Sequence, residues 1–242
     1  MLGNGGVLAA GGSLPRAAAI ASPSAGRRLQ LVAEIAVLFV LLPLVVLHVV
    51  VDLKVALFLV LPPVLAVFLL LLLIDPTFRL VDELKRGFAP GEALSMLLLY
   101  LVAGGALAAL VAELMPRQFL AMPRNRPEVW GKILLLYPLL SVAAQELVYR
   151  TFFFHRYGPL FNGHRGLLII VNGLLFGFGH VLFGNWIAVL GTATAGMLLA
   201  YRYEATRSFW AVWIEHTLWG WLVFTIGLGG YFFTGVSNFV LR

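Results

Sequence analysis

The sequence contains no cysteine in its 242 residues. Disulfide bonds, thiolate metal ligands and a cysteine nucleophile are therefore excluded, and any metal would have to be held by histidine and carboxylate side chains. Charge is also scarce, because only 12% of the residues are charged while 61% are hydrophobic. In soluble domains about a quarter of the residues are charged and roughly half are apolar. This composition indicates a protein that lies within a membrane.

Long apolar runs support this class, because they approach the ~20 residues that a helix needs to cross a bilayer. The last run contains the sequence GLGG at 227–230, which is a weak place for a continuous helix, so this run forms one helix or two. We therefore predict an all-α polytopic membrane protein, a bundle of seven or eight transmembrane helices with a polar intramembrane cavity. The expected spans are 30–51, 54–74, 93–114, 131–154, 165–184, 186–203 and 209–233.

The expected spans divide the chain into three parts. Residues 1–28 are rich in Gly, Ala, Ser and Pro, lack acidic residues and predict a flexible basic tail. A cleaved signal peptide fits less well, because the next apolar run is span-length and ends without a small-residue cleavage site. N-terminal transmembrane helices follow over 29–128, and residues 129–242 form a second transmembrane part. The joint at 75–92 has a polar centre that suits a short interfacial helix.

The net charge of +6 needs no nucleic-acid partner, because cytoplasmic loops of membrane proteins are enriched in Lys and Arg. Most basic joints fall on the cytoplasmic side if the N-terminus is cytoplasmic, although the basic joint at 115–130 disagrees. We expect an integral multi-pass protein of a bacterial inner membrane with a cytoplasmic N-terminus.

Five ionisable residues lie well inside predicted spans, and all belong to the last 100 residues: Glu146, Arg150, His180, Glu215 and His216. Such residues are rare in transmembrane helices and usually face the bundle interior or a water-filled cavity. Each has a plain structural explanation when taken alone, such as a buried ion pair, a histidine bonded to a carbonyl, or a histidine in an interfacial aromatic belt.

Taken together, these side chains predict a hydrolytic site. A carboxylate beside a histidine can draw a proton from water, and a second histidine can donate to the oxyanion that forms when this water attacks a carbonyl. Burial and mutual coupling are the usual means of bringing such groups near neutral pH. Hydrolysis of a peptide bond inside the membrane is the reaction class that follows.

Three motifs in this order resemble those of the family of CAAX proteases and bacteriocin-processing intramembrane proteases, which includes the type II CAAX prenyl endopeptidases. The first motif is QELVYR from Gln145 to Arg150, the second is FGFGH from Phe176 to His180, and the third begins at His216. The resemblance covers about residues 130–233. It implies a catalytic core over 129–242, with a site formed by Glu146, Arg150, His180 and His216. We also predict that Arg150 is structural and holds Glu146 or a backbone carbonyl rather than touching substrate.

Two positions depart from the family pattern. Gln145 stands where the family usually has a first glutamate, the one held to activate water, and an amide cannot act as a base. Gly220 stands where the family usually has Asn or Asp, four residues after the histidine of the third motif, and it has no side chain to donate.

Three alternatives follow from these departures. Glu146 is itself the base on a rotated helix, or Glu215 supplies the missing carboxylate, or the protein is an inactive family member that binds a peptide or a lipid-linked partner. We favour Glu146 as the base. Asn185, shortly after His180, is a candidate replacement for the absent donor.

The resemblance leaves the metal open, since the family is described both as metalloproteases and as metal-independent glutamate proteases. His180, His216 and Glu146 could form a three-ligand zinc site with an open fourth position. No H-E-x-x-H motif is present, and we favour metal-independent action without a cofactor. The expected function is an intramembrane endopeptidase, with a membrane-bound peptide or protein as substrate and the lipid bilayer as its surroundings.

Overall fold

The computed structural model describes residues 23–232, and every regular element in that part of the chain is a helix. The α-helices are α1 (Ala25–Ala36), α2 (Leu42–Val51), α3 (Leu57–Leu73), α4 (Leu80–Lys85), α5 (Pro90–Leu99), α6 (Gly105–Leu114), α7 (Ala121–Asn125), α8 (Pro127–Tyr137), α9 (Ala143–Glu146), α10 (Phe153–Tyr157), α11 (Arg165–Gly179), α12 (Trp186–Thr206) and α13 (Phe209–Ile226). The predicted all-α class is confirmed.

Several of these helices join through π-helical turns into longer rods. The π-helical turns are Val37–Leu41, Tyr100–Gly104, Pro138–Val142 and Leu147–Phe152, and short 3₁₀ segments are Gly158–Phe161, Val181–Phe183 and Gly229–Phe232. Four rods are long and apolar enough to cross a membrane: Ala25–Val51, Pro90–Leu114, Pro127–Phe161 and Arg165–Phe183. The structure thus supports an integral membrane protein with four such helices by length and composition, and it does not confirm the predicted count of seven or eight.

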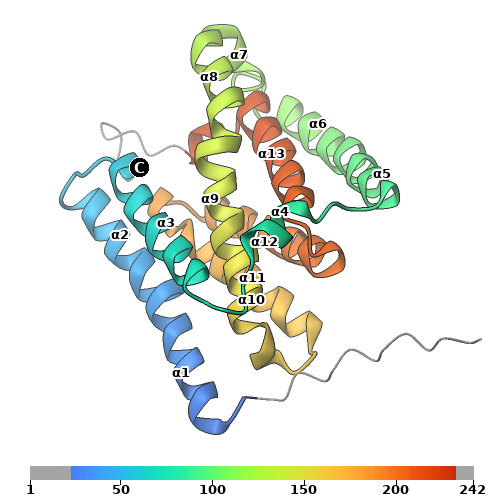
Figure 1. The fold of residues 1–242 in the computed structure, drawn as a ribbon. Coiled ribbons are helices and arrows are strands. Elements are labelled where there is room, and N and C mark those ends of the chain that lie inside the picture. The colour runs from blue at the N-terminus through green and yellow to red at the C-terminus, as the bar shows by residue number, and fades with distance from the viewer. Residues whose placement is uncertain (1–22, 233–242) are drawn as a thin grey trace, which may run out of the picture.

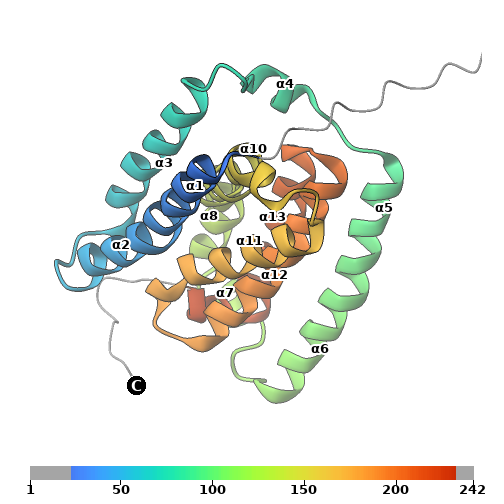
Figure 2. The ribbon, with the colours of Figure 1, turned by 90° about the horizontal axis from the view of Figure 1, so that it is seen from below.

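The helices form three groups side by side. Figures 1 and 2 show α1 to α3 along one side of the molecule and α5 with α6 along the opposite side, with α8 to α13 between them. The outer groups present large apolar side chains to the surroundings, such as Leu29 at 73% and Val102 at 72% exposure. Exposed apolar surface on this scale suits contact with lipid. The inner group carries the predicted site residues.

The segment that carries the first motif contains two π-helical turns. The rod Pro127–Phe161 contains α8, α9 and α10, and α9 is only the four residues from Ala143 to Glu146 between two π turns. Pro138 begins the first of these turns, and proline removes one backbone hydrogen bond from a helix. Each π turn changes the direction of the following side chains, and such turns occur frequently at functional sites.

Two glycines let α11 and α12 approach closely. A Cβ added to Gly177 would lie 2.6 Å from the Cβ of Ala193 and 2.7 Å from the carbonyl oxygen of Val189. A Cβ added to Gly173 would lie 2.7 Å from the backbone nitrogen of Met197. Small residues permit this kind of contact between membrane helices. This close approach fixes the position of α11, the helix that ends beside His180.

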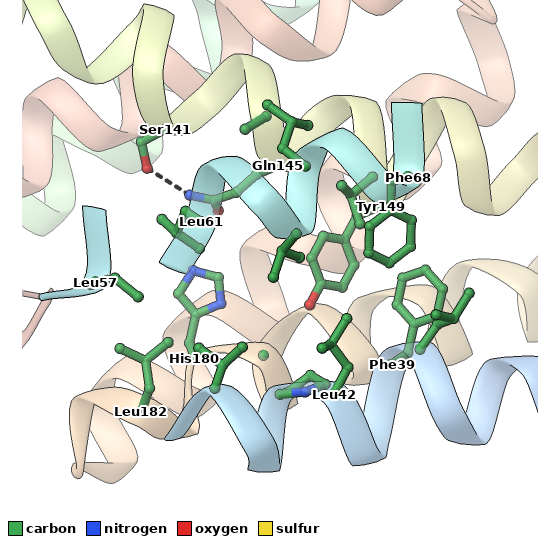
Figure 3. A pocket seen from close by; sticks show the side chains of 18 of the residues that line it. Phe39, Leu42, Leu57, Leu61, Phe68, Ser141, Gln145, Tyr149, His180 and Leu182 are labelled. Atoms are coloured by element: carbon green, nitrogen blue, oxygen red, sulfur yellow. Dashed lines mark hydrogen bonds between the residues drawn. The ribbon is translucent and has the colours of Figure 1, made fainter. Parts of the chain in front are cut away.

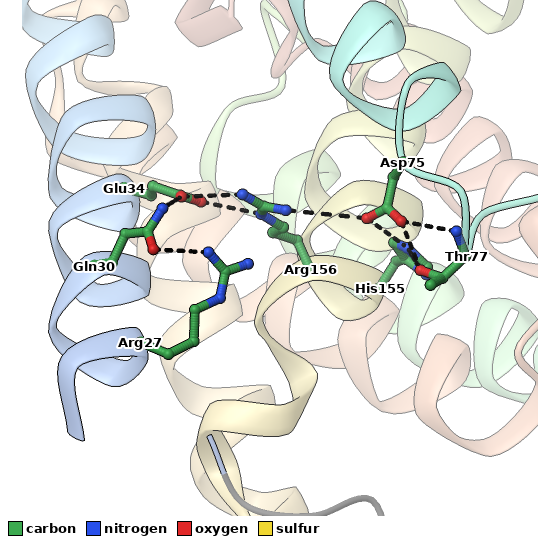
Figure 4. A network of polar contacts seen from close by, with 7 residues as sticks. All are labelled: Arg27, Gln30, Glu34, Asp75, Thr77, His155 and Arg156. Atoms are coloured by element: carbon green, nitrogen blue, oxygen red, sulfur yellow. Dashed lines mark hydrogen bonds and ion pairs between the residues drawn. The ribbon is translucent and has the colours of Figure 1, made fainter. Parts of the chain in front are cut away.

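Polar contacts tie one end of the bundle together, as Figure 4 shows. The guanidinium of Arg156 donates two hydrogen bonds of 3.0 Å to Glu34 on α1, and its Nη1 lies 4.0 Å from Asp75, which follows α3. Burial raises the pKa of the Asp75 carboxyl, but hydrogen bonds from Thr77 and the charge and hydrogen bond of His155 outweigh it, and the pKa lies below its usual value. This network holds α1, α3 and α10 in place.

Some predicted boundaries change. The tail predicted over 1–28 ends earlier, because α1 begins at Ala25 with Ser24 as its N-cap, and residues 1–22 of that tail lie outside the described residues. A short helix was expected in 75–92, and α4 forms there; its location at the membrane interface stays a prediction. The last predicted span, 209–233, divides at Gly227, where α13 ends with a backbone φ of +104° that favours glycine. Residue 233 of that span lies outside the described residues.

Candidate active site

Three of the predicted site residues meet at the centre of the bundle. Glu146 on α9 and Arg150, four residues later, are both fully buried, and Arg150 Nε lies 3.3 Å from Glu146 Oε2. His216 on α13 places its Nδ1 2.7 Å from Glu146 Oε1. Because a carboxylate only accepts hydrogen bonds, His216 donates through Nδ1. The shared acid joins α9 to α13.

Arg150 has further contacts that suit a structural role. Its Nη2 donates a 3.0 Å hydrogen bond to the carbonyl oxygen of Gly196 on α12, and its guanidinium lies 4.5 Å from the ring centroid of Phe176. The planar guanidinium can make an ion pair, a hydrogen bond and a stacking contact at once, which a lysine cannot. Arg150 therefore holds both Glu146 and a backbone carbonyl, as the sequence led us to expect.

Phe176 on α11 is the common neighbour of the two histidines. Its ring centroid lies 4.6 Å from that of His180 and 5.7 Å from that of His216. Its carbonyl oxygen accepts a 2.7 Å hydrogen bond from His180 Nδ1. A carbonyl oxygen cannot donate, so Nδ1 carries the hydrogen and Nε2 of the neutral ring keeps a free lone pair. His180 is thus held as an acceptor at the end of α11.

A cavity of about 170 Å³ lies beside His180, between the N-terminal helices and the rod that contains α9. Figure 3 shows the His180 ring and the Gln145 amide at one end of it, with Tyr149 further along. Most of the wall is apolar and comes from both halves of the chain, and the polar side chains in the lining are Ser141, Gln145, Tyr149 and His180. The Gln145 amide nitrogen donates a 2.8 Å hydrogen bond to Ser141 Oγ.

The predicted polar cavity shared by four ionisable residues is corrected by this geometry. The cavity lining includes His180 but not Glu146, Arg150 or His216, and it is mainly apolar. Buried polar groups are normally hydrogen-bonded, and Glu146 meets this requirement through His216 rather than by facing a void. Gln145, one position earlier on α9, faces the cavity instead.

The two supporting candidates lie elsewhere. Glu215 accepts hydrogen bonds of 2.8 and 3.3 Å from the guanidinium of Arg202 on α12, and Arg202 also bonds Glu92 on α5. Glu215 therefore belongs to a buried ion-pair group that joins α5, α12 and α13. Asn185 is the N-cap of α12, where its Oδ1 accepts from the Ala188 N–H and its amide donates to the carbonyl oxygen of Tyr231. Neither residue lines the cavity.

The three candidate zinc ligands do not form a metal site in this arrangement. Among residues 23–232, no group of three or more His, Asp or Glu side chains is close enough to hold a metal ion. Both ring nitrogens of His216 are already engaged, Nδ1 by Glu146 and Nε2 by the hydroxyl of Tyr137 at 3.1 Å. A histidine bound to zinc needs one nitrogen free for the metal. The residues present do not fit a zinc ion held by His180, His216 and Glu146.

Sequence reasoning missed Tyr137, Ser141 and Tyr149. Tyr137, Ser141 and Gln145 follow each other at intervals of four, which places them near one face of a helix. This spacing was a usable signal, because three hydrogen-bonding side chains on one face of an otherwise apolar segment are unusual. The partner of Tyr137 on α13 could not be read from the same pattern, since it lies 79 positions away.

The chain matches the family model described as type II CAAX prenyl endopeptidase Rce1-like over residues 126–222. No curated protein and no solved structure matches the chain. The matched segment contains all three motifs and ends just after Gly220. The family resemblance of the motifs is therefore confirmed over residues 126–222, the part of the chain that matches this family model.

Proposed function

We propose that this chain is a CAAX-protease-like membrane endopeptidase that hydrolyses a peptide bond of a membrane-bound substrate with glutamate and histidine side chains and without metal. The observation that carries the proposal is the cavity beside His180. It offers an apolar wall for a lipid-embedded peptide and, at one end, a histidine nitrogen with a free lone pair. The remaining inner helices, α12 and α13, complete the membrane bundle in this proposal.

In this mechanism His180 accepts the proton of the attacking water. Its Nδ1 is fixed on the Phe176 carbonyl, as a carboxylate fixes the histidine of a hydrolase, and its Nε2 is open to the cavity. Gln145, beside it, can hold the same water through its amide. The role of Glu146 is to accept from His216 Nδ1 and so to hold the His216 ring, which packs against the Phe176 ring behind His180.

Glu146 as the base, which the sequence favoured, stays a prediction. It requires the side chains around Glu146 to move, because Glu146 is 0% exposed and does not line the cavity. Its Oε2 also faces the Arg150 guanidinium, with Nε at 3.3 Å, so that side of the carboxylate is occupied. His180 lines the cavity, and among the described residues it forms no ion pair, so neither difficulty applies to it.

A second candidate function is binding without hydrolysis. It is favoured by one observation, the presence of Gln145 in a cavity whose described lining residues include no Asp or Glu. An apolar cavity with a few polar groups at one end is a common form of ligand site. In this alternative the cavity holds an apolar peptide or a lipid-linked partner that is released unchanged.

The test is peptide hydrolysis by the purified chain in lipid nanodiscs, with a set of apolar membrane peptides and product detection by mass spectrometry. His180→Gln should lower the rate by about 10²–10⁴, the usual contribution of a general base. The matched control is His164→Gln, because His164 also bonds a carbonyl through Nδ1, at 2.9 Å, but is exposed and outside the cavity. Full activity of His180→Gln with loss of activity in Glu146→Gln would assign the base to Glu146. Peptide binding with no cleavage by the native chain would support the second candidate.

A further inference from the structure

His216 has a hydrogen-bond partner on each side of its ring. Glu146 accepts from Nδ1, so Nε2 of the neutral ring is an acceptor, and the hydroxyl of Tyr137 lies 3.1 Å from it. A phenol hydroxyl can donate to that nitrogen. Glu146, His216 and Tyr137 thus form a hydrogen-bonded chain from α9 through α13 to α8.

Gly220 is the reason why Tyr137 can reach this nitrogen. Gly220 lies one helical turn after His216 on α13, and a Cβ built there would overlap the Tyr137 ring, with Tyr137 Cζ at 2.6 Å and its hydroxyl oxygen at 2.7 Å. Any side chain at position 220 would therefore displace the tyrosine. The ring itself is held by edge contact with Phe224, at 5.5 Å between centroids.

We propose that Tyr137 is the positioning residue of His216 and takes the place that a side chain at position 220 would otherwise occupy. Its hydroxyl fixes the His216 ring with the hydrogen on Nδ1, and the fixed ring supports Phe176, which in turn holds His180 at the cavity. Asn185 does not fill this role, because it caps α12. The effect on catalysis rests on the proposed function, whereas the hydrogen bond itself does not.

The hydrogen bond is tested by ¹⁵N NMR of histidine-labelled protein in nanodiscs, with His216→Gln to assign the two ring signals of His216. Tyr137→Phe keeps the ring and removes only the hydroxyl, so the Nε2 signal should move to the position of an unbonded acceptor while Nδ1 stays bonded. The control is Tyr157→Phe, since within the described residues the buried Tyr157 hydroxyl has no hydrogen-bond partner. It should leave both signals unchanged.

A pair of substitutions at positions 137 and 220 tests whether Tyr137 occupies the space that a side chain at position 220 would fill. Gly220→Asn alone should disturb the His216 signals, because the new side chain meets Tyr137. Tyr137→Ala combined with Gly220→Asn should return Nε2 to the bonded position, since the asparagine amide then donates from the next turn of α13. In the hydrolysis assay Tyr137→Phe should lower kcat at least several-fold with KM unchanged, and the double variant should recover part of it.

These readouts separate the two proposals. If the native chain hydrolyses no peptide but Tyr137→Phe moves the Nε2 signal, the proposed function fails and the positioning role stands. If both His216 signals are unchanged in Tyr137→Phe, or if the double variant leaves Nε2 unbonded, the inference is overturned whatever the activity.

Discussion

His216 on α13 and Glu146 on α9, 70 positions apart in the chain, are joined by a hydrogen bond of 2.7 Å between Nδ1 and Oε1. Arg150 lies on the second oxygen of the same carboxylate. The buried carboxylate thus has a cation on one side and a histidine on the other. Removal of the carboxylate leaves the buried Arg150 guanidinium without a counter-charge, since its other hydrogen bond goes to the neutral carbonyl of Gly196.

Glu146→Ala should therefore destabilise the protein strongly. Breaking a buried ion pair by removing one partner costs about 3–5 kcal/mol, because the remaining charge is uncompensated, and here that charge is Arg150. The measurement is thermal unfolding in detergent, followed by circular dichroism. Glu128→Ala, at an exposed glutamate in the first turn of α8, is the matched control and should have little effect. Equal unfolding temperatures for the two variants would mean that the ion pair between Glu146 and Arg150 does not stabilise the protein.

Gly177→Ala should separate α11 from α12. The added methyl would meet Ala193 Cβ at 2.6 Å and a backbone oxygen at 2.7 Å, and backbone atoms cannot move aside as a flexible side chain can. Overpacking of this kind typically costs about 1–3 kcal/mol. Gly166→Ala on the same helix is the control, because nothing lies within 4 Å of its added Cβ. Gly166→Ala should leave the thermal unfolding temperature unchanged or raise it slightly, whereas Gly177→Ala should lower it. A comparable decrease in both variants would contradict the close approach of α11 and α12.

The lowered pKa of Asp75 predicts that the protein loses stability at acidic pH. Hydrogen bonds from Thr77 and the contact with His155 outweigh the effect of burial and hold its folded-state pKa below the ordinary value of 3.8. A carboxyl with a depressed folded pKa stabilises the fold above its unfolded pKa, and this contribution is lost as the pH falls through the folded pKa. The difference in unfolding temperature between native protein and Asp75→Asn should therefore be constant above about pH 5 and shrink below about pH 4. A difference that grows on acidification would contradict the assignment.

The sequence could predict the fold class and the three motifs but not how the motifs meet. Apolar runs predicted the all-helical class, and the glycines at 227–230 predicted the break after α13, because both act through local chain properties. The number of spans did not follow from the same runs. The direction of α9 was not predictable, since two π-helical turns surround it and i, i+4 spacing assumes a regular helix. Gln145 therefore faces the cavity and Glu146 faces α13. From residue type alone, the glutamate was the better candidate to face the cavity, because a glutamine cannot act as a base.

Contacts between distant segments decided the rest of the site. Glu215 was a plausible acid because it adjoins His216, but Arg202 on α12 already binds it. Tyr137 was overlooked because an aromatic residue in a membrane helix carries no signal until its partner is known. Gly220 was read as a lost donor, whereas the structure shows the space that it leaves being filled by the tyrosine.

Gln145→Glu should raise activity. Gln145 lines the cavity with His180, so a carboxylate there would face the same water and could share its proton with the histidine. The measurement is kcat/KM at several pH values in the nanodisc assay, with Ser141→Ala as a control for the hydrogen bond that now holds the amide. Unchanged or lower activity in Gln145→Glu, with full folding, would show that the water is held elsewhere.

The most direct test of the endopeptidase assignment is cleavage of a membrane peptide in ¹⁸O-labelled water, with mass analysis of both products. The account predicts that the native chain yields one labelled oxygen in the new carboxyl terminus, that His164→Gln does the same, and that His180→Gln yields no labelled product above background. Equal labelled product from native protein and His180→Gln would contradict the role of His180, and no product from the native chain or from Gln145→Glu would contradict the hydrolytic function itself.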